Sequence, residues 1–307
     1  MTHSMQFDLP SSLSVDLHND IAVLSLSRPE KRNAIDFAMI RGLDRFFSEL
    51  PDSIRAVVIH GKGDHFSAGL DLSSISDIDT SAVLFGSQAW HRVFDRIEHG
   101  NVPVIAVLHG AVVGGGLELA AAAHIRVAER GTFYALPEGS RGIFVGGGAS
   151  VRVPQLIGVP RMVDMMLTGR TYGAEEGVAL GLSQYLVEPG EGLAKGLELA
   201  RRVIANAPLS NFGVIQALPR IARADPDTGL LLESLMISVA AADDEAKVRL
   251  RAFLDKRAQK VSHQDSGAAF GGSKKKPARA ALFEQTETER IERGLGRPCD
   301  AGNLTMA

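Results

Sequence analysis

The stretch Gly110-Ala-Val-Val-Gly114-Gly115-Gly116-Leu-Glu118 decides how this chain is interpreted. It follows an apolar run over residues 102–108 and leads into an alanine-rich segment that ends at residue 123. The run predicts a buried strand and the alanine-rich segment a short helix. Glycines at such a turn let the backbone approach a ligand and leave N–H groups free to point at it. A helix that begins near Gly115 adds the partial positive charge of its N-terminus.

Known nucleotide-binding loops do not fit this stretch. A dinucleotide site requires G-x-G-x-x-G at a strand-to-helix turn, and Gly114-Gly115-Gly116 has the wrong spacing. The chain also lacks G-x-x-x-x-G-K-[ST], which excludes a nucleotide P-loop. Close packing of a helix on a sheet remains the structural alternative for the three glycines.

Two glutamates are the candidate acid/base groups. Glu118 lies in a segment that is apolar on every face, where a carboxylate is costly unless it is paired, hydrogen-bonded or protonated. Its structural alternative is a salt bridge to Arg126 or Arg141. Glu138 ends a short predicted strand and, taken alone, reads as an exposed loop acid. If both lie in one apolar pocket, their pKa values move apart, which lets one site hold an acid and a base.

The first half of the chain alternates predicted strands and helices. Residues 13–17 and 21–27 are β-like and flank an Asn19-Asp20 turn, which predicts a hairpin. Residues 54–59 and 133–136 predict further strands. Apolar residues at helical spacing follow Asp36, and a second helix precedes residue 102. This pattern predicts an α/β fold.

The second half is predicted to be helical. Residues 193–205, 209–221, 230–242 and 245–259 have helical patterns separated by prolines. Residues 263–277 are rich in Gly, Ser and Lys, and the segment after them has little to bury. We therefore divide the chain into a core (12–200), a C-terminal helical region (201–262) and a mobile tail (263–307).

Composition excludes several classes of protein. The chain has 307 residues, 45% of them hydrophobic, with a net charge of -3. This balance lacks the basic stripe of a nucleic-acid binder, and no apolar run approaches the roughly 18 residues of a membrane span. Cys299 is the single cysteine, and clustered metal ligands are absent from the sequence. We expect a cytoplasmic protein that binds neither nucleic acid nor membrane and holds no metal.

Four segments, taken in order, resemble the crotonase (enoyl-CoA hydratase/isomerase) superfamily. They are Arg28-Pro-Glu-Lys-Arg-Asn-Ala34, Phe66-Ser-Ala-Gly-Leu-Asp-Leu72, Gly110 to Glu118, and Pro137-Glu138. The interval of 20 residues between Glu118 and Glu138 equals that between the two glutamates of the hydratase branch. The resemblance covers residues 12–261. It implies a right-handed spiral of ββα units and C-terminal helices that form trimers or hexamers.

The resemblance also implies roles for particular residues. Glu118 and Glu138 would be the catalytic pair, and the backbone N–H groups of Leu70 and Gly115 the oxyanion hole. Coenzyme A, as part of the substrate, would be contacted by Lys31, Arg32, Ala34, Ser67, Ala68, Asp71 and Leu72. No separate cofactor is expected.

The expected activity is hydration of a 2-enoyl-CoA. Gly139 to Gly148 replaces the proline-containing segment usual in hydratases and resembles the branch that acts on 3-methylthioacryloyl-CoA with release of methanethiol. The alternatives are a general short-chain or branched enoyl-CoA hydratase, an isomerase on the same fold and, outside enzymes, an RNA-binding homologue suggested by Lys274-Lys275-Lys276.

Overall fold

The computed structural model describes residues 7–74, 79–255 and 257. Its strands are β1 (Leu13–His18), β2 (Ile21–Leu26), β3 (Ala56–Gly61), β4 (Val104–Leu108), β5 (Ala111–Val113), β6 (Ile125–Glu129), β7 (Phe133–Ala135), β8 (Tyr172–Gly173) and β9 (Tyr185–Val187). Its α-helices are α1 (Phe37–Ser48), α2 (Thr80–Glu98), α3 (Gly115–Ala122), α4 (Ala149–Ile157), α5 (Val159–Thr168), α6 (Ala174–Leu180), α7 (Gly192–Ile204), α8 (Pro208–Phe212), α9 (Leu218–Arg223), α10 (Pro226–Ala242) and α11 (Asp244–Leu254). Short 3-10 turns span Pro29–Lys31, Leu72–Ser74 and Gly139–Arg141.

Two sheets organise the strands. The larger has six strands in the order β1-β2-β3-β4-β6-β9, where β1 runs antiparallel to β2 and the other neighbours are parallel. The smaller has the order β5-β7-β8. The β1–β2 hairpin is confirmed, and Asn19 in its turn has a left-handed φ of 56°. The predicted strands at 54–59, 102–108 and 133–136 are also present, with ends shifted by one to two residues.

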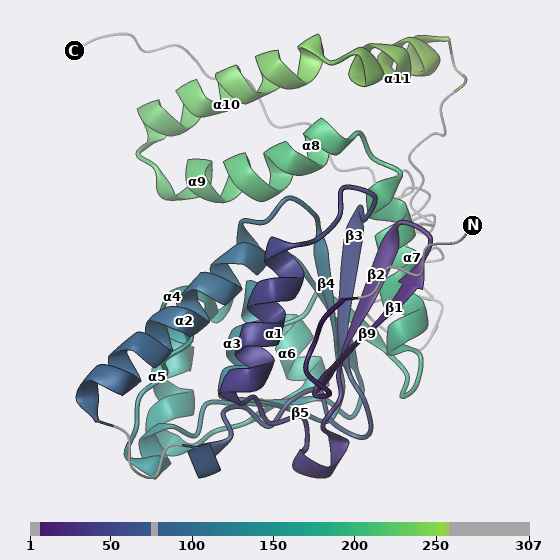
Figure 1. Cartoon of the computed structure of the whole chain (residues 1–307). Coiled ribbons are helices and arrows are strands. Elements are labelled where there is room, and N and C mark those ends of the chain that lie inside the picture. The colour runs from purple at the N-terminus through teal and green to yellow at the C-terminus, as the bar shows by residue number, and fades with distance from the viewer. Residues whose placement is uncertain (1–6, 75–78, 256, 258–307) are drawn as a thin grey trace, which may run out of the picture. The chain divides into compact units, whose positions relative to one another are not determined.

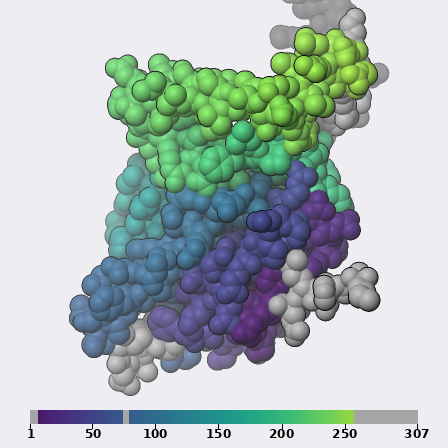
Figure 2. Space-filling view, turned by 45° about the horizontal axis from the view of Figure 1, so that its top comes forward, coloured from purple at the N-terminus to yellow at the C-terminus, as the bar shows by residue number. Residues whose placement is uncertain are grey.

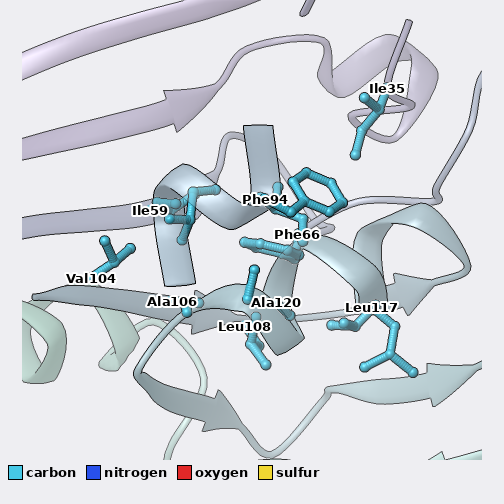
Figure 3. Close-up of a cluster of buried hydrophobic side chains, with 14 of the residues drawn as sticks. Ile35, Ile59, Phe66, Phe94, Val104, Ala106, Leu108, Leu117 and Ala120 are labelled. Atoms are coloured by element: carbon cyan, nitrogen blue, oxygen red, sulfur yellow. The ribbon is translucent and has the colours of Figure 1, made fainter. Parts of the chain in front are cut away.

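The inner strands β2, β3 and β4 of the larger sheet are buried on both faces, which explains their continuous apolar sequences. Val57 and Ile59 of β3 belong to one core, and Ala56 and Val58 belong to the other. Helices α1, α2 and α3 cover the first face and α7 the second (Figure 1). Figure 3 shows the first core, in which α3 packs against the sheet and the segments around it through Phe66, Leu108, Leu117 and Ala120.

Helix α1 begins where the sequence predicts. The carboxylate of Asp36 accepts a 2.8 Å hydrogen bond from Met39 N and so caps the helix. Met39, Leu43 and Phe46 are buried on its inner face. In α2, the helix predicted before residue 102, Trp90, Phe94 and Ile97 are buried.

The predicted C-terminal helices are present, with differences in their limits. Pro219 does not break the 209–221 helix, because the chain passes from α8 through a π-helical turn (Gly213–Ala217) directly into α9, and Pro219 lies in the first turn of α9. The predicted domain boundary at residues 200/201 falls inside α7, whose Leu199 and Ala200 pack on the sheet. The predicted tail, residues 263–307, lies outside the described residues.

The outer helices carry many exposed apolar side chains. In Figure 2 the light-green α10 and α11 lie outside α8 and α9, and α10 packs on α9. Leu230, Leu231, Ile237, Val248 and Phe253 are each more than half exposed. None of the helices described here is long and apolar enough to cross a membrane.

Candidate active site

Two glycine-containing segments, residues 66–72 and residues 110–118, lie side by side at the end of the larger sheet and are joined by backbone hydrogen bonds. Ser67 N donates to Ala111 O (2.9 Å), and Val113 N donates to Ser67 O (3.1 Å). Gly69 and Gly114 both have positive φ angles, 88° and 51°. A Cβ atom at Gly69 would lie 2.5 Å from Val113 O, so the close approach of the two segments requires glycine there.

This pairing brings the two predicted oxyanion donors together. Gly115 is the first residue of α3, so its N–H has no acceptor within the helix. Leu70 N makes no hydrogen bond to the described residues. A Cβ atom at Gly115 would lie only 3.3 Å from Leu70 N, which places the two N–H groups as neighbours on the same surface.

Glu118 projects from the first turn of α3 and is 4% exposed. Its Oε1 accepts hydrogen bonds from Gly147 N (2.8 Å) and Ala149 N (3.1 Å). Burial raises the pKa of Glu118, and these two N–H groups partly oppose that rise.

The salt-bridge alternative for Glu118 does not hold within the described residues. Arg126 instead donates to the carbonyl oxygens of Leu182 (2.8 Å) and Ala123 (2.5 Å). Burial lowers the pKa of the Arg126 guanidinium to about 10. The carboxylate of Glu118 is therefore held by backbone amides and carries no countercharge in direct contact.

Glu138 is also buried, contrary to its reading as an exposed loop acid, and is 7% exposed. It precedes the Gly139–Arg141 turn. Its Oε2 is buried without a hydrogen-bond partner among the described residues. Burial raises its pKa, its own backbone N–H opposes the rise, and the nearby charge of Glu118 adds to it. A carboxyl group with an unpaired buried oxygen favours the neutral form.

Both glutamates line one cavity of about 200 Å³. Leu70 and Gly115 line it as well, so the four residues predicted for catalysis meet there. The rest of the lining is mostly apolar and includes Phe37, Ala68, Leu72, Val83, Trp90, Ile143, Phe144 and Val145. The hydroxyl-bearing residue Ser87 lines the cavity as well. Arg141 is the basic residue in this lining.

The residues predicted to contact coenzyme A fall into two groups. Ala68 and Leu72 line the cavity, whereas Lys31 and Arg32 are exposed. Lys31 is the last residue of the 3-10 turn before α1, and Arg32 caps the end of that turn. This turn is attached to the oxyanion segment, because Ala68 N donates to Arg32 O (2.9 Å). Ala34 follows and is half-buried.

Ser67 and Asp71 hold the oxyanion segment (residues 66–72, which carry the Leu70 N–H) in place. Ser67 is fully buried, and its hydroxyl donates to Asn33 O (2.8 Å) and accepts from Gly69 N (3.1 Å). Asp71 pairs with Arg28 at 3.0 Å. The hydroxyl of Ser73 and then Arg28 hold the pKa of Asp71 below its ordinary value. Their roles in coenzyme binding stay predictions.

Sequence reasoning missed the part of the site that lies after Glu138. Gly147 and Ala149 supply the N–H groups that hold Glu118, and Phe144 and Val145 line the cavity. From the sequence, Gly146-Gly147-Gly148 is interpreted only as part of the segment that replaces the usual proline-containing segment of hydratases, and not as a source of donors to Glu118. A run of three glycines indicates a close backbone approach, but the sequence does not show that its partner is Glu118, 29 positions earlier.

The parallel sheet with its covering helices, and the two neighbouring backbone N–H groups that make no hydrogen bond among the described residues, agree with the crotonase class of fold. The family model described as Enoyl-CoA hydratase/isomerase matches residues 16–264, and the chain belongs to this family. The predicted α/β crotonase fold is therefore confirmed; the role of its last helices in trimer formation stays a prediction.

Similar proteins agree with this family. The chain is 29% identical over 250 residues to the short-chain-enoyl-CoA hydratase of Clostridium acetobutylicum, which covers 80% of this chain and 96% of that protein. A crystal structure of a candidate enoyl-CoA hydratase from Rhodopseudomonas palustris is 61% identical, with a TM-score of 0.79 over 83% of this chain and 98% of that one. The enoyl-CoA hydratase from Bacillus anthracis is 27% identical, with a TM-score of 0.76 over 81% and 98% of the two chains.

Proposed function

We propose that this protein adds water to the double bond of a short-chain 2-enoyl-CoA. One observation carries the proposal: two buried glutamates with different hydrogen-bond environments line the same cavity as the N–H groups of Leu70 and Gly115. Hydration needs a group that takes a proton from water and a group that gives one to carbon. An isomerase needs only one such carboxylate, so the pair favours a hydratase.

The oxyanion donors would act on the thioester carbonyl. When its oxygen lies between Leu70 N and Gly115 N, negative charge that develops during addition meets two fixed donors. Such donors stabilise the transition state more than the substrate, and each contributes about 3 kcal/mol. The first-turn position of Gly115 adds the partial positive charge of the α3 N-terminus.

The two glutamates would divide the proton transfers. One oxygen of Glu118 accepts hydrogen bonds from the Gly147 and Ala149 amides, and these donors favour the ionised form. Glu118 also lines the cavity. There it takes a proton from water while the oxygen of that water bonds to Cβ. Glu138 lacks such donors, which favours its neutral form, and it gives its proton to Cα. Proton exchange with water then restores both groups.

The cavity supports a short, uncharged acyl group. Its volume is about 200 Å³, and its lining is mostly apolar, with Trp90 packed closely against Gly115 and Gly147. Together with the Gly139–Gly148 resemblance, this supports 3-methylthioacryloyl-CoA as the particular substrate. Hydration at its Cβ gives a hemithioacetal that expels methanethiol and leaves malonate-semialdehyde-CoA, and a second water then cleaves the thioester to release CoA.

We further propose a cytoplasmic homotrimer or a hexamer of two trimers. The exposed apolar side chains of α10 and α11 support assembly through these helices, because a monomer rarely exposes so many together. Sedimentation of the full chain tests the assembly.

Product analysis tests the activity. Crotonyl-CoA incubated with the enzyme in heavy water is expected to give 3-hydroxybutyryl-CoA with deuterium at Cα. Migration of the double bond without net addition of water would contradict hydration. A parallel assay measures methanethiol release from 3-methylthioacryloyl-CoA. The kcat/KM of this reaction is expected to exceed the kcat/KM for hydration of crotonyl-CoA. The reverse order would indicate a general short-chain hydratase.

A further inference from the structure

Each of the peptide units that hold Glu118 is itself held at its carbonyl end. The N–H of Gly147 belongs to the peptide unit whose carbonyl is Gly146 O, and Ser87 Oγ donates a 2.6 Å hydrogen bond to that oxygen. The N–H of Ala149 belongs to the unit whose carbonyl is Gly148 O, which accepts from Val151 N and Arg152 N, each at 3.1 Å. The second anchor is backbone of α4, but the first is a side chain.

We propose that Ser87 is a positioning residue for the Glu118 carboxylate, acting through the Gly146–Gly147 peptide unit. This inference rests on the proposed function, in which Glu118 takes a proton from water. The chain of contacts runs from Ser87 Oγ–H to Gly146 O, and from Gly147 N–H to Glu118 Oε1. Linked hydrogen bonds polarise one another, so the donor that faces Glu118 is strengthened by the acceptor role of Gly146 O.

Helix α2 continues this chain away from the cavity. The single hydroxyl proton of Ser87 is used on Gly146 O, so His91 Nε2, at 3.4 Å from Ser87 Oγ, is placed to donate to that oxygen. Ser87 and His91 are one turn apart on the same face of α2. Trp90, between them in sequence, packs against the loop, since a Cβ atom at Gly147 would lie 3.0 Å from its Cε3.

A second side chain holds the next peptide unit. Arg152 Nη1 donates to Gly147 O (3.3 Å), while its Nε donates to Glu98 Oε2 (2.6 Å) at the end of α2. The side chain of Arg152 is 10% exposed, so its position is fixed by packing as well as by charge. The loop is thus held to α2 at Ser87 and, through Arg152, at Glu98.

The charged groups that face Glu118 come from three elements. His91 of α2 and Arg152 of α4 lower the pKa of Glu118 when charged, and Glu138, before the 139–141 turn, lies near enough for its charge to be coupled to that of Glu118. Loss of the Ser87 hydroxyl leaves all of these groups in place. It weakens the Gly147 donor and also removes the contact of His91 Nε2 with Ser87 Oγ. A weaker donor to a carboxylate raises its pKa.

Ser87→Ala, measured beside Ser81→Ala on the exposed part of α2, tests the proposal. We expect Ser87→Ala to lower kcat for crotonyl-CoA roughly three- to tenfold. The acidic limb of the pH–kcat profile is expected to move upward by roughly half a pH unit, with KM changed less than about twofold. Ser87→Thr, which keeps the hydroxyl, should restore the wild-type profile, and Ser81→Ala should match wild type.

Two results would overturn the proposal. A raised KM with an unmoved pH profile would mean that Ser87 contacts the substrate directly, and wild-type kinetics would mean that it positions nothing. Glu118→Gln separates this failure from that of the proposed function. If Glu118→Gln is inactive while Ser87→Ala is normal, only the positioning role fails; if Glu118→Gln is fully active, the proposed function itself fails.

Discussion

The N–H of Gly147 donates a 2.8 Å hydrogen bond to Oε1 of Glu118 across 29 residues of sequence. This contact joins the first turn of α3 to the glycine run before α4, and it lets a carboxylate remain in an apolar environment. The same residue leaves no room for a side chain, because a Cβ atom at Gly147 would lie 2.6 Å from Glu118 Oε2 and 3.0 Å from Trp90 Cε3.

Gly147→Ala is therefore expected to displace Glu118 or Trp90. We expect kcat to fall by roughly tenfold or more, because small misplacements of a catalytic group are costly. The free energy of unfolding should fall by roughly 1–3 kcal/mol, as for other overpacked sites. Gly131→Ala is the matched control, since a Cβ there meets nothing within 4 Å. Equal activity of both variants, measured with crotonyl-CoA, would argue against the Gly147 contact.

The pH dependence of activity follows from the raised pKa values of both glutamates. Activity needs Glu118 ionised, so it falls as the pH drops through the raised pKa of that site. It also needs Glu138 protonated, so it falls again as the pH rises through the second, higher pKa of the coupled pair. A plot of kcat/KM against pH should be bell-shaped, with both limbs above the range of a free carboxyl group. A profile without an alkaline limb would contradict the acid role of Glu138.

Glu98 is expected to stabilise the fold at neutral pH. Burial alone would raise its pKa, but Arg152 and then Arg223 lower it below the ordinary value. A lowered pKa means that the stabilisation is present above the unfolded-state pKa and is lost as the pH falls through the folded-state pKa. Glu98→Gln leaves Arg152 partly unpaired, so urea unfolding at pH 7 should show a loss of roughly 3 kcal/mol that shrinks toward pH 3.

Glu175→Gln provides the control for this experiment. Glu175 pairs with Arg130 on the surface, where both side chains are about half exposed, and such pairs contribute little. A loss of stability for Glu98→Gln no larger than that for Glu175→Gln would contradict the stabilising role of the Glu98–Arg152 pair.

Trp90 is expected to limit the length of the acyl chain. Its ring lines the cavity beside Gly115 and Gly147 and packs edge-on against Phe94, with ring centroids 5.5 Å apart. Trp90→Phe should deepen the cavity, so kcat/KM should move toward six- and eight-carbon enoyl-CoA substrates by roughly fourfold for each buried CH₂ group. An unchanged order of substrates, compared with wild type, would show that another residue sets the length.

Much of the core could be predicted from the sequence because its strands have strong local patterns. The alternation at 13–17, the β-branched run at 54–59 and the helical spacing after Asp36 are signals contained within a few residues. The interpretation missed β5, β6, β8 and β9. Residues 172–173 and 185–187 are too short to show the alternation of apolar and polar residues that is typical of a strand. The position of β9 in the sheet is set by its pairing with β6.

The candidate site shows the same division. The burial of Glu118 was predicted from its apolar neighbours, whereas the burial of Glu138 came only from the resemblance to the family, since nothing local to it indicates burial. The contacts of Gly147 and Ser87 could not be predicted, because they join residues 29 and 59 positions apart across the fold.

The measurement that tests the central claim most directly compares Glu118→Gln and Glu138→Gln with wild type. Hydration of crotonyl-CoA and binding of a CoA thioester would be measured on the same preparations. Both variants are expected to lose hydration by a factor of about 100 or more, in the range that general acid/base groups contribute, while they bind the thioester as wild type does. Full hydration by either variant would contradict the two-glutamate account.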